Sequence, residues 1–335
     1  MMGSGVVVGL VTSVGCAVVL RGLARRRRIV GKAGAPLSEQ GRNLPPVGGL
    51  ALAIGCLSGA IVWARQHGIP WTNELLGLTS AGAIVLTLGL VDDFVRELTP
   101  WQKLLGQTLA WLVLCRVGIL AQIAVLPMWA NWLISLVWTL AIINAFNLLD
   151  IADGLAIGIG LIASVAFLML SLLSGQAVLA GLLAALCGAL AGVLVFNFPQ
   201  ATLFLGDSGS LLLGLLLAAL ALSISYAPLG REVALFTPVI VLGLPIYDLA
   251  FVTLVRLRRG QPIFQKSEDH FVFRLVRSGW PPSRAVLAMF GLGLAFSAVA
   301  VVISQVSNRL GFTVLGVVVA VALGWGVRVA KVPAT

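Results

Sequence analysis

The sequence predicts an all-α fold, a bundle of ten or eleven membrane-spanning helices that forms a single domain over residues 1–335. Two observations predict this fold. The chain is 59% hydrophobic and only 10% charged, whereas about 25% of the residues of a soluble domain are charged. The apolar residues also gather in runs close to the ~20 residues that cross the hydrocarbon core of a bilayer. Such a small number of charged residues cannot cover a water-exposed surface, so lipid must contact most of the outer surface of the protein.

Eleven apolar runs can be read along the chain. They are Val6–Leu23, Val47–Ala64, Leu75–Val91, Leu104–Leu120, Trp132–Ile143, Leu155–Leu173, Ala177–Phe196, Leu211–Tyr226, Val233–Val255, Ala285–Ser304 and Leu310–Val329. The fifth run is short and Pro127 obscures its start, so ten spans are the alternative. We expect the first run to be a retained span, because signal peptides carry their positive charges before the apolar stretch and here Arg25 to Arg28 follow it.

The basic residues predict the orientation. If the N-terminus lies outside, 18 of the 22 Lys and Arg residues fall in inner connectors, three fall outside, and Arg116 lies within a span. This asymmetry is typical of the positive-inside rule. It explains the basic composition without a nucleic-acid partner. We therefore expect a multi-pass protein of the plasma (inner) membrane, with its active site at the cytoplasmic face.

The acidic residues then indicate a site. Ten of the twelve Asp and Glu residues lie on or near the inner side, and acids contribute little to orientation. Carboxylates at the ends of spans are costly unless they are paired, hydrated or bound to a cation. Five of them fall in three separate clusters, and we expect these to share one site: Asp92, Asp93, Asp150, Asp153 and Asp207.

The first cluster is the adjacent pair Asp92 and Asp93 at the inner end of the third run. Two neighbouring carboxylates repel each other, and a divalent metal relieves that repulsion. Thr99-Pro100-Trp101-Gln102 then predicts a capping box. The box places Lys103 in the first turn of the next helix, where its ammonium can hold a phosphate. The structural alternative is a solvated helix end paired with Arg96.

The second cluster is Asn144, Asn147, Asp150 and Asp153. Polar residues at every third position predict one broad polar face of a helix. Such a face suits a base, a ribose or a metal, and a plain polar connector is the alternative.

The third cluster is Gly206-Asp207-Ser208-Gly209, at the start of the eighth run. A helix N-terminus with small residues favours anions, and Asp207 suits a metal ligand beside a pyrophosphate, with a simple N-cap as the alternative. In the last inner connector, His270 and Arg274 are one helical turn apart. A guanidinium binds phosphate oxygens in a bidentate manner, although His270 could equally be an ordinary loop histidine.

Taken together, these segments resemble the polyprenyl-phosphate N-acetylhexosamine-1-phosphate transferase family. The matching segments are collinear: GRNLPPVGGLAL (41–52), GLVDDFVRELTPWQKLLGQ (89–107), NAFNLLDIADGLA (144–156), LFLGDSGSLLLG (203–214), PIYDLAFVTLVRLRRG (245–260) and DHFVFRLVRSG (269–279). The resemblance implies transfer of a sugar phosphate from a UDP-N-acetylhexosamine to a polyprenyl phosphate lipid with release of UMP, a Mg²⁺ cofactor with Mn²⁺ as the alternative ion, and an arrangement compatible with a homodimer.

The resemblance also implies roles for individual residues. Asp92 and Asp93 would be the catalytic pair with Lys103 near the phosphates, and Asp93 would share the metal with Asp207. Asn144, Asn147, Asp150 and Asp153 would line the nucleotide pocket. His270 and Arg274 would close over the pyrophosphate or the lipid phosphate. A further family aspartate matches Asp248, and the sequence does not explain its role.

The chain departs from the family pattern at three places. Ile151 follows Asp150 where a glycine is usual, Phe273 replaces a second histidine, and no histidine lies around residues 41–44. N-acetylglucosamine is the expected sugar. A phospho-N-acetylmuramoyl-pentapeptide transferase is less favoured, because its multi-histidine loop is absent at 269–277. A membrane prenyltransferase would need a second close acid pair, and a secondary transporter would show repeated halves.

Overall fold

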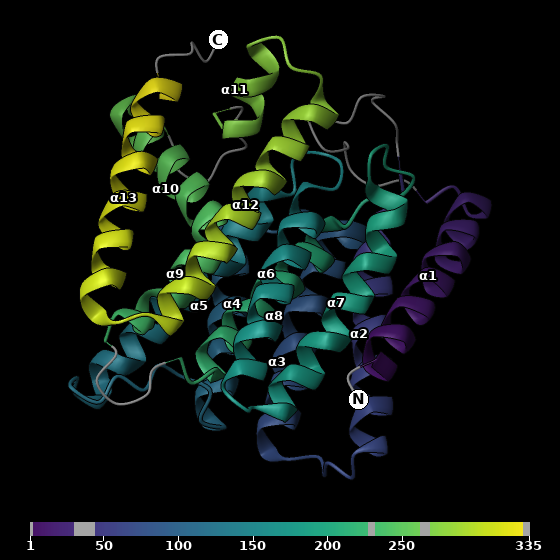
Figure 1. Ribbon diagram of the computed structural model, residues 1–335. Coiled ribbons are helices and arrows are strands. Elements are labelled where there is room, and N and C mark those ends of the chain that lie inside the picture. Colours follow the sequence, from purple (N-terminus) through teal and green to yellow (C-terminus); the bar gives the residue numbers. More distant parts are fainter. Residues whose placement is uncertain (1–2, 30–43, 227–231, 262–268, 331–335) are drawn as a thin grey trace. The chain divides into compact units, whose positions relative to one another are not determined.

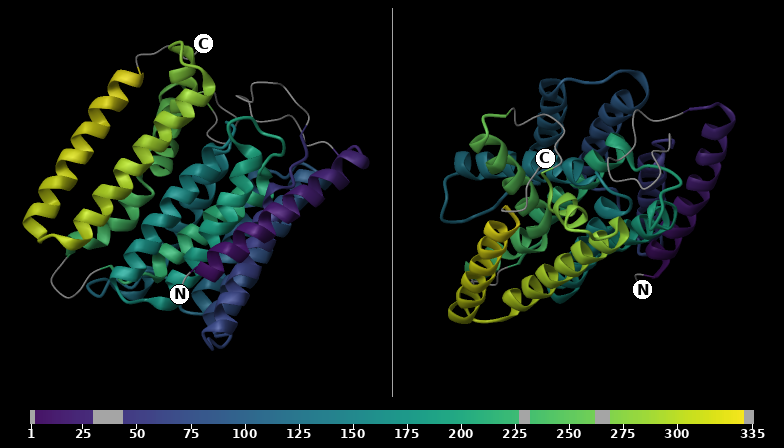
Figure 2. Two further views of the ribbon diagram at one scale, coloured as in Figure 1. Left: turned by 45° about the vertical axis from the view of Figure 1, so that its right-hand side comes forward. Right: turned by 90° about the horizontal axis from the view of Figure 1, so that it is seen from above.

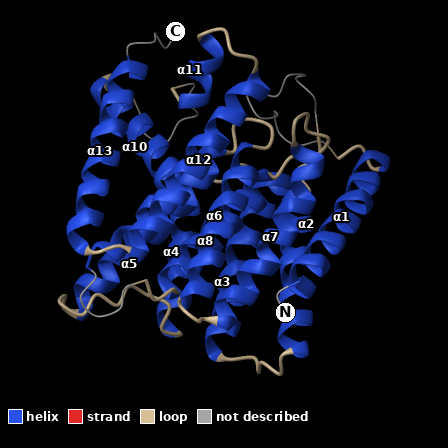
Figure 3. Ribbon diagram, in the orientation of Figure 1, coloured by secondary structure: helices blue, strands red, loops and turns tan. Residues whose placement is uncertain are grey.

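The computed structural model describes residues 3–29, 44–226, 232–261 and 269–330 (Figure 1). Within these ranges the chain is helical, with no strand (Figure 3), as the sequence predicts. The chain divides into two compact units, Met1–Ile224 and Ser225–Thr335, and each is described by itself. The first unit holds helices α1 to α8, and the second holds α9 to α13.

The first unit is built around one buried helix. Its helices are α1 (Gly3–Arg26), α2 (Gly48–Gln66), α3 (Asn73–Leu90), α4 (Pro100–Arg116), α5 (Met128–Leu149), α6 (Leu155–Leu173), α7 (Ala177–Asn197) and α8 (Gly206–Ser223). Every residue of α8 from Ser208 to Ala221 is buried. A helix that is apolar all round must be surrounded by others, and α8 packs against α2, α3, α5 and α6.

Small residues let the outer helices of this unit approach closely. The helix α1 packs along α2 and α7 (Figure 2). A Cβ added to Gly188 on α7 would lie 2.1 Å from the carbonyl oxygen of Val6 on α1. Close backbone contact at small residues is a common way for helices to associate in lipid, where apolar burial offers little driving force.

The second unit contains a broken helix. A 3₁₀ turn, Glu232–Phe236, leads into α9 (Thr237–Val241), and α10 (Gly243–Arg258) follows at an angle of 72°. We expected one straight span over Val233–Val255. The break has a physical reason, because Pro245 lacks the N–H that would bond to the carbonyl of Val241. The helix α12 (Pro282–Gln305) packs against α9, α10, α11 (Phe271–Arg277) and α13 (Asn308–Ala330).

In the described part of the chain, eight helices are long and apolar enough to cross a membrane, or nine if the bent pair counts as one span. The protein is thus a polytopic helix bundle. The expected fifth span belongs to the longer helix α5, whose N-cap is Pro127. The expected fourth span belongs to α4, which has 17 residues and is too short to be counted among the eight. The apolar part of α13, Asn308–Ala322, is likewise a shorter apolar helix.

The contact between α3 and α8 generates a first prediction. A Cβ on Gly89 would lie 2.3 Å from the backbone N and Cα of Ser208, whereas a Cβ on Gly82, two turns earlier, would lie 3.4 Å from the flexible Cδ1 of Leu212. Because overpacking against a backbone costs about 1–3 kcal/mol, we expect Gly89→Ala to lower the melting temperature of the detergent-solubilised protein. The matched variant Gly82→Ala should melt like the wild type, and equal melting of both variants would contradict the close approach.

Candidate active site

The helix α3 continues into a π-helical turn, Val91–Val95, that carries the aspartate pair. Such turns are often found at functional sites because the wider turn redirects side chains. Asp92 is only 9% exposed. Its Oδ1 accepts the backbone N–H of Leu98 at 2.6 Å, and its Oδ2 accepts a hydrogen bond from Lys103 Nζ at 3.0 Å. Asp92 therefore ties the connection after α3 back onto the helix.

Asp93 binds the N-terminus of α8. Its Oδ1 accepts the backbone N–H of Asp207 at 2.9 Å, and its Oδ2 accepts that of Ser208 at 3.0 Å. A carboxylate at this position satisfies unpaired amides and interacts favourably with the helix dipole. Gly206 has a φ of +76°, and a Cβ there would lie 2.7 Å from Asp93 Oδ2. The glycine is required both by the backbone conformation and by the space.

Lys103 joins the first and third clusters. The predicted capping box is confirmed: Thr99 Oγ1 accepts the N–H of Gln102, and Gln102 Oε1 accepts the N–H of Thr99. Lys103 lies in the first turn of α4 as expected. Its ammonium donates to Asp92 and forms a short ion pair with Asp207. Two aspartates that are far apart in sequence thus share one cation.

The second cluster differs from the expected continuous helix. The helix α5 ends at Leu149, so Asn144 and Asn147 lie on the helix while Asp150 and Asp153 follow its end. Asn147 Nδ2 donates to Ser210 Oγ on α8 at 3.0 Å. Asp153 Oδ2 accepts the backbone N–H of Ala201 at 3.0 Å. The chain turns because Gly154, with a φ of +77°, starts a new helix.

Asp150 lies close to the other carboxylates. Burial raises the pKa of Asp150 to about 8, and the negative charges of Asp207, Asp93 and Asp153 act in the same direction. The backbone N–H of Gly206, the first residue of α8, partly offsets this rise. The bonds from Asp93 to the N-terminus of α8 and from Asn147 to Ser210, together with these charges near Asp150, show that all three aspartate clusters meet at one end of the first unit.

Sequence reasoning missed several supporting residues. Gln107 on α4 exchanges hydrogen bonds with Asn144, including Asn144 Nδ2 to Gln107 Oε1 at 2.8 Å. Asn197 at the end of α7 accepts the N–H of Gly154 and donates to the carbonyl of Leu203, both at 2.8 Å. Their signal in the sequence is a single amide in an otherwise apolar run, which is costly in lipid unless it is paired.

The segment before α2 positions the start of α8. The backbone N–H of Phe204 donates to the carbonyl of Pro45, and Gly48 donates to the carbonyl of Phe204, at 3.0 and 2.9 Å. A Cβ on Gly49 would lie 2.4 Å from the backbone N of Gly209. The described part of the motif at 41–52 therefore supports the Asp207 loop. Its first three residues, 41–43, lie outside the described residues.

The donor set fits a divalent cation that is completed by substrate. Within the described ranges, no three His, Cys, Asp or Glu side chains form a ready metal site. Mg²⁺, however, is commonly bound by one or two carboxylates together with substrate phosphates and waters. Asp207 and Asp93 are neighbouring hard oxygen donors, since the backbone N–H of Asp207 bonds to Asp93 Oδ1. Burial raises the pKa of Asp150, and repulsion by the charges of Asp207, Asp93 and Asp153, which a cation would relieve, adds to this rise.

The second unit holds the remaining candidates. Asp248 and His270 are 2% and 1% exposed. His270 Nδ1 lies 2.6 Å from Asp248 Oδ2, and the backbone N–H of Phe271 donates to Asp248 Oδ1 at 3.0 Å. Asp248 thus binds the imidazole and caps the start of α11 at the same time. His270 is not an ordinary solvent-exposed loop histidine.

Arg274 is also buried. Its Nη2 lies 3.3 Å from Asp269 Oδ1, its Nε donates to the carbonyl oxygen of Asp269, and its guanidinium stacks 5.0 Å from the ring centre of Phe251. Arg259 Nη1 reaches the same Asp269 oxygen at 3.0 Å. Burial lowers the pKa of Arg274, Asp269 opposes this, and the charges of Arg259 and Arg277 add to it.

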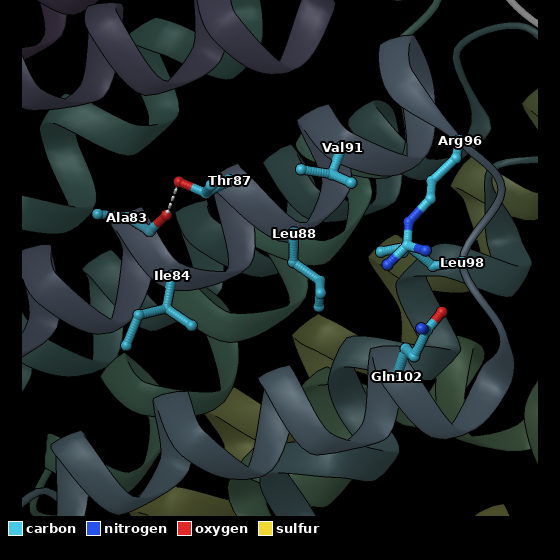
Figure 4. Close-up of a pocket in the computed structure, with 8 residues that line it drawn as sticks. All are labelled: Ala83, Ile84, Thr87, Leu88, Val91, Arg96, Leu98 and Gln102. Atoms are coloured by element: carbon cyan, nitrogen blue, oxygen red, sulfur yellow. Dashed lines mark hydrogen bonds between the residues drawn. The ribbon is translucent and has the colours of Figure 1, made fainter.

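A separate pocket lies between α3 and α4 (Figure 4). It has a volume of about 570 Å³ and an apolar lining, with Arg96 and Gln102 at one end. Val91 and Leu98 line this pocket. Val91 precedes Asp92 in the sequence, and the backbone N–H of Leu98 donates to Asp92 Oδ1. The aspartates themselves do not line it.

These features place the chain among the polytopic membrane proteins that carry a cluster of aspartates at one end of a helix bundle. Residues 75–225 match the model of glycosyl transferase family 4. The chain is 33% identical to a decaprenyl-phosphate N-acetylglucosaminephosphotransferase of Mycobacterium tuberculosis (strain CDC 1551 / Oshkosh), over 73% of this chain and 69% of the relative. On these grounds, the chain belongs to glycosyl transferase family 4.

Two further relatives cover more of the chain. A probable undecaprenyl-phosphate N-acetylglucosaminyl 1-phosphate transferase of Bacillus subtilis (strain 168) is 27% identical over 94% of this chain and 89% of the relative. A phospho-N-acetylmuramoyl-pentapeptide-transferase of Levilactobacillus brevis is 30% identical over 83% of this chain and 90% of the relative.

The surroundings of Asp150 generate a pH prediction. The pKa of this group is about 8 in the folded protein and about 4 when unfolded. The folded state therefore binds the extra proton in between, and the free energy of unfolding should fall as the pH rises from about 4 to about 8. In EDTA, Asp150→Asn should remove this part of the pH dependence of the melting temperature. An unchanged pH dependence would show that Asp150 does not titrate in this range.

The Asp248–His270 pair generates another prediction. Because Asp248 binds both the imidazole and the first amide of α11, Asp248→Ala should make the amides of α11 exchange faster with solvent than His270→Ala does. Hydrogen exchange measured by mass spectrometry on the full chain checks this. Equal protection of α11 in both variants would contradict the capping role.

Proposed function

We propose that the protein transfers N-acetylglucosamine 1-phosphate from UDP-N-acetylglucosamine to a polyprenyl phosphate, releasing UMP and giving a polyprenyl-diphosphate sugar for cell-envelope polysaccharide synthesis. The main support for this proposal is that three aspartate clusters and Lys103 lie together at one end of the first unit. The relatives named as N-acetylglucosamine phosphotransferases support the sugar and the lipid.

The proposed chemistry is a displacement at phosphorus. An oxygen of the lipid phosphate attacks the phosphorus that bears the sugar, a new P–O bond forms, and the bond from that phosphorus to the bridging oxygen breaks. UMP leaves with the bridging oxygen. The second pKa of a phosphate monoester is near ~6, so the attacking phosphate is largely dianionic at neutral pH and needs little help from a general base. Such reactions depend mainly on positioning and charge neutralisation.

The residues have proposed roles in this reaction. Asp207 and Asp93 would hold Mg²⁺, which when bound neutralises charge on the pyrophosphate. Lys103, now shared by Asp92 and Asp207, would bind a phosphate oxygen. Asn144, Asn147, Asp150 and Asp153 would face the nucleotide. His270 and Arg274 of the second unit would bind phosphate oxygens.

The contacts of the aspartate pair favour direct transfer over a phospho-aspartate intermediate. Both oxygens of Asp93 accept backbone N–H groups of α8. Both oxygens of Asp92 accept hydrogen bonds, from Leu98 and Lys103. A carboxylate held in this way loses part of its nucleophilicity, and attack on phosphorus would break contacts that hold the site together.

The second candidate is transfer of phospho-N-acetylmuramoyl-pentapeptide, which the similarity to relatives of that name favours. A panel of UDP-sugars with thin-layer separation of the lipid products distinguishes the two. We also propose that the site faces the cytoplasm of the inner membrane with the N-terminus outside, because 18 of 22 basic residues then lie inside.

The carboxylates generate a prediction for activity. Asp207→Asn and Asp93→Asn should each abolish Mg²⁺-dependent UMP release, because a neutral amide binds a divalent cation far more weakly than a carboxylate does. Glu97→Gln is the matched control, since this exposed acid lies in the same connection outside the cluster. EDTA should stop the wild-type reaction. Robust turnover by either aspartate variant in detergent would remove that residue from the mechanism.

A further inference from the structure

Gln107 is a fully buried carboxamide on α4, with a side chain that is 0% exposed. It lies four residues after Lys103, so the two side chains share one face of the helix. A carboxamide has an oxygen that accepts hydrogen bonds and two N–H groups that donate them, and leaving these unpaired inside a protein is costly. The bonds of Gln107 therefore show what the residue does.

The partner of Gln107 is Asn144 on α5. Asn144 Nδ2 donates to Gln107 Oε1 at 2.8 Å and to the carbonyl oxygen of Leu140, one turn earlier, at 2.7 Å. Gln107 Nε2 lies 3.5 Å from Asn144 Oδ1, which is a long and weak contact. Both N–H groups of Asn144 thus have acceptors, and its oxygen is the atom that remains available to a ligand.

Asn147 is held in the same sense. It lies three residues after Asn144, on the same half-buried face of α5. Its Nδ2 donates to Ser210 Oγ at 3.0 Å, and the Ser210 hydroxyl donates to the carbonyl oxygen of Asp207 at 3.4 Å. Each asparagine therefore has its nitrogen bound by a neighbouring helix, so that the two side chains present oxygen along one face.

An oxygen that only accepts hydrogen bonds selects the donors of a ligand. Phosphate oxygens are acceptors as well, so Asn144 Oδ1 does not suit them, whereas a hydroxyl or an N–H group does. The ammonium of Lys103, one turn away from Gln107 on α4, has the opposite preference because it only donates. The two ends of this short stretch of α4 thus favour different parts of one nucleotide sugar.

We propose that Gln107 is a positioning residue, which by binding Asn144 Nδ2 directs Asn144 Oδ1 toward a hydroxyl or N–H group of the UDP-sugar. This inference rests on the proposed function for the identity of the ligand. The carbonyl of Leu140 binds only one N–H group of Asn144. Without Gln107 the carboxamide is held at a single point, and its second N–H group is free to face the ligand in place of the oxygen.

Steady-state kinetics test this role. Gln107→Met keeps the size of the side chain and removes its acceptor. The KM for the UDP-sugar should rise about tenfold, the loss typical of one hydrogen bond, and the KM for polyprenyl phosphate should stay unchanged. Gln102→Met is the matched control, since Gln102 is an exposed glutamine of α4 whose oxygen binds the N–H of Thr99 and not Asn144. It should leave both KM values unchanged.

A double variant shows whether Gln107 acts through Asn144. Asn144→Ala should raise the KM for the UDP-sugar, and adding Gln107→Met should raise it no further, because the residue that Gln107 positions is already gone. Multiplying effects would overturn the inference. If Gln107→Met does not fold, Gln107→Asn replaces it with the same expected results, since the shorter side chain keeps a carboxamide and withdraws its oxygen from Asn144.

A binding measurement separates this inference from the proposed function. UDP-N-acetylglucosamine with Mg²⁺ should raise the melting temperature of the detergent-solubilised wild type, and no turnover is needed for this. The rise should be smaller for Gln107→Met, while the rise with Mg²⁺ alone should match the wild type. Equal rises with the nucleotide sugar overturn the inference, and so does loss of the Mg²⁺ effect alone, which would make Asn144 a cation ligand. Absence of UMP release by the wild type would instead refute the transferase activity, and the melting temperatures would still decide the inference.

Discussion

The two hydrogen bonds from the N-terminus of α8 to Asp93 hold the candidate site together. They join the end of α3 to the start of the most buried helix of the first unit. The bonds require that the two backbones approach closely, and Gly89 and Gly206 provide the space. Everything that surrounds Asp207 depends on this junction, because the same turn of α8 presents Asp207 to Lys103.

The candidate site brings like charges together at a cost in stability. Five aspartates gather at one end of the first unit, where Lys103 pairs with two of them, and burial together with like charge raises the pKa of Asp150 to about 8. Such repulsion weakens the folded protein unless a cation enters. In the proposed reaction the same arrangement would be useful, because a strongly negative cluster would attract a divalent ion together with its substrate. The folded protein tolerates this cost because backbone amides and Lys103 stabilise part of the negative charge of the aspartates.

Much of the fold and of the candidate site could be predicted from the sequence, and each feature that could not be predicted has a physical reason. The spans follow from length and hydropathy, and the capping box at Thr99 follows from local residue types. The bend after Val241 does not show in the hydropathy because the apolar run continues through Pro245, although a proline inside such a run can mark a break in the helix. Asp150 and Asp153 were assigned to a helix because a three-residue spacing cannot show where Gly154 takes a positive φ. The partners Gln107 with Asn144, and Asp248 with His270, are long-range pairs that no local pattern reveals.

The hydrogen bonds divide the aspartates into two groups with different capacities. Asp92 and Asp93 use both oxygens to accept hydrogen bonds from backbone amides and Lys103, and Asp93 keeps further lone pairs with which it would share the cation with Asp207. Asp207 is bound by Lys103, a side chain that can move when phosphate arrives. In the proposed reaction, an incoming phosphate would compete for the ammonium of Lys103, and the oxygen of Asp207 that Lys103 now binds would become available to a cation. Substrate binding and cation binding would then be coupled through one lysine, which fits the lack of a ready three-carboxylate metal site among the described residues.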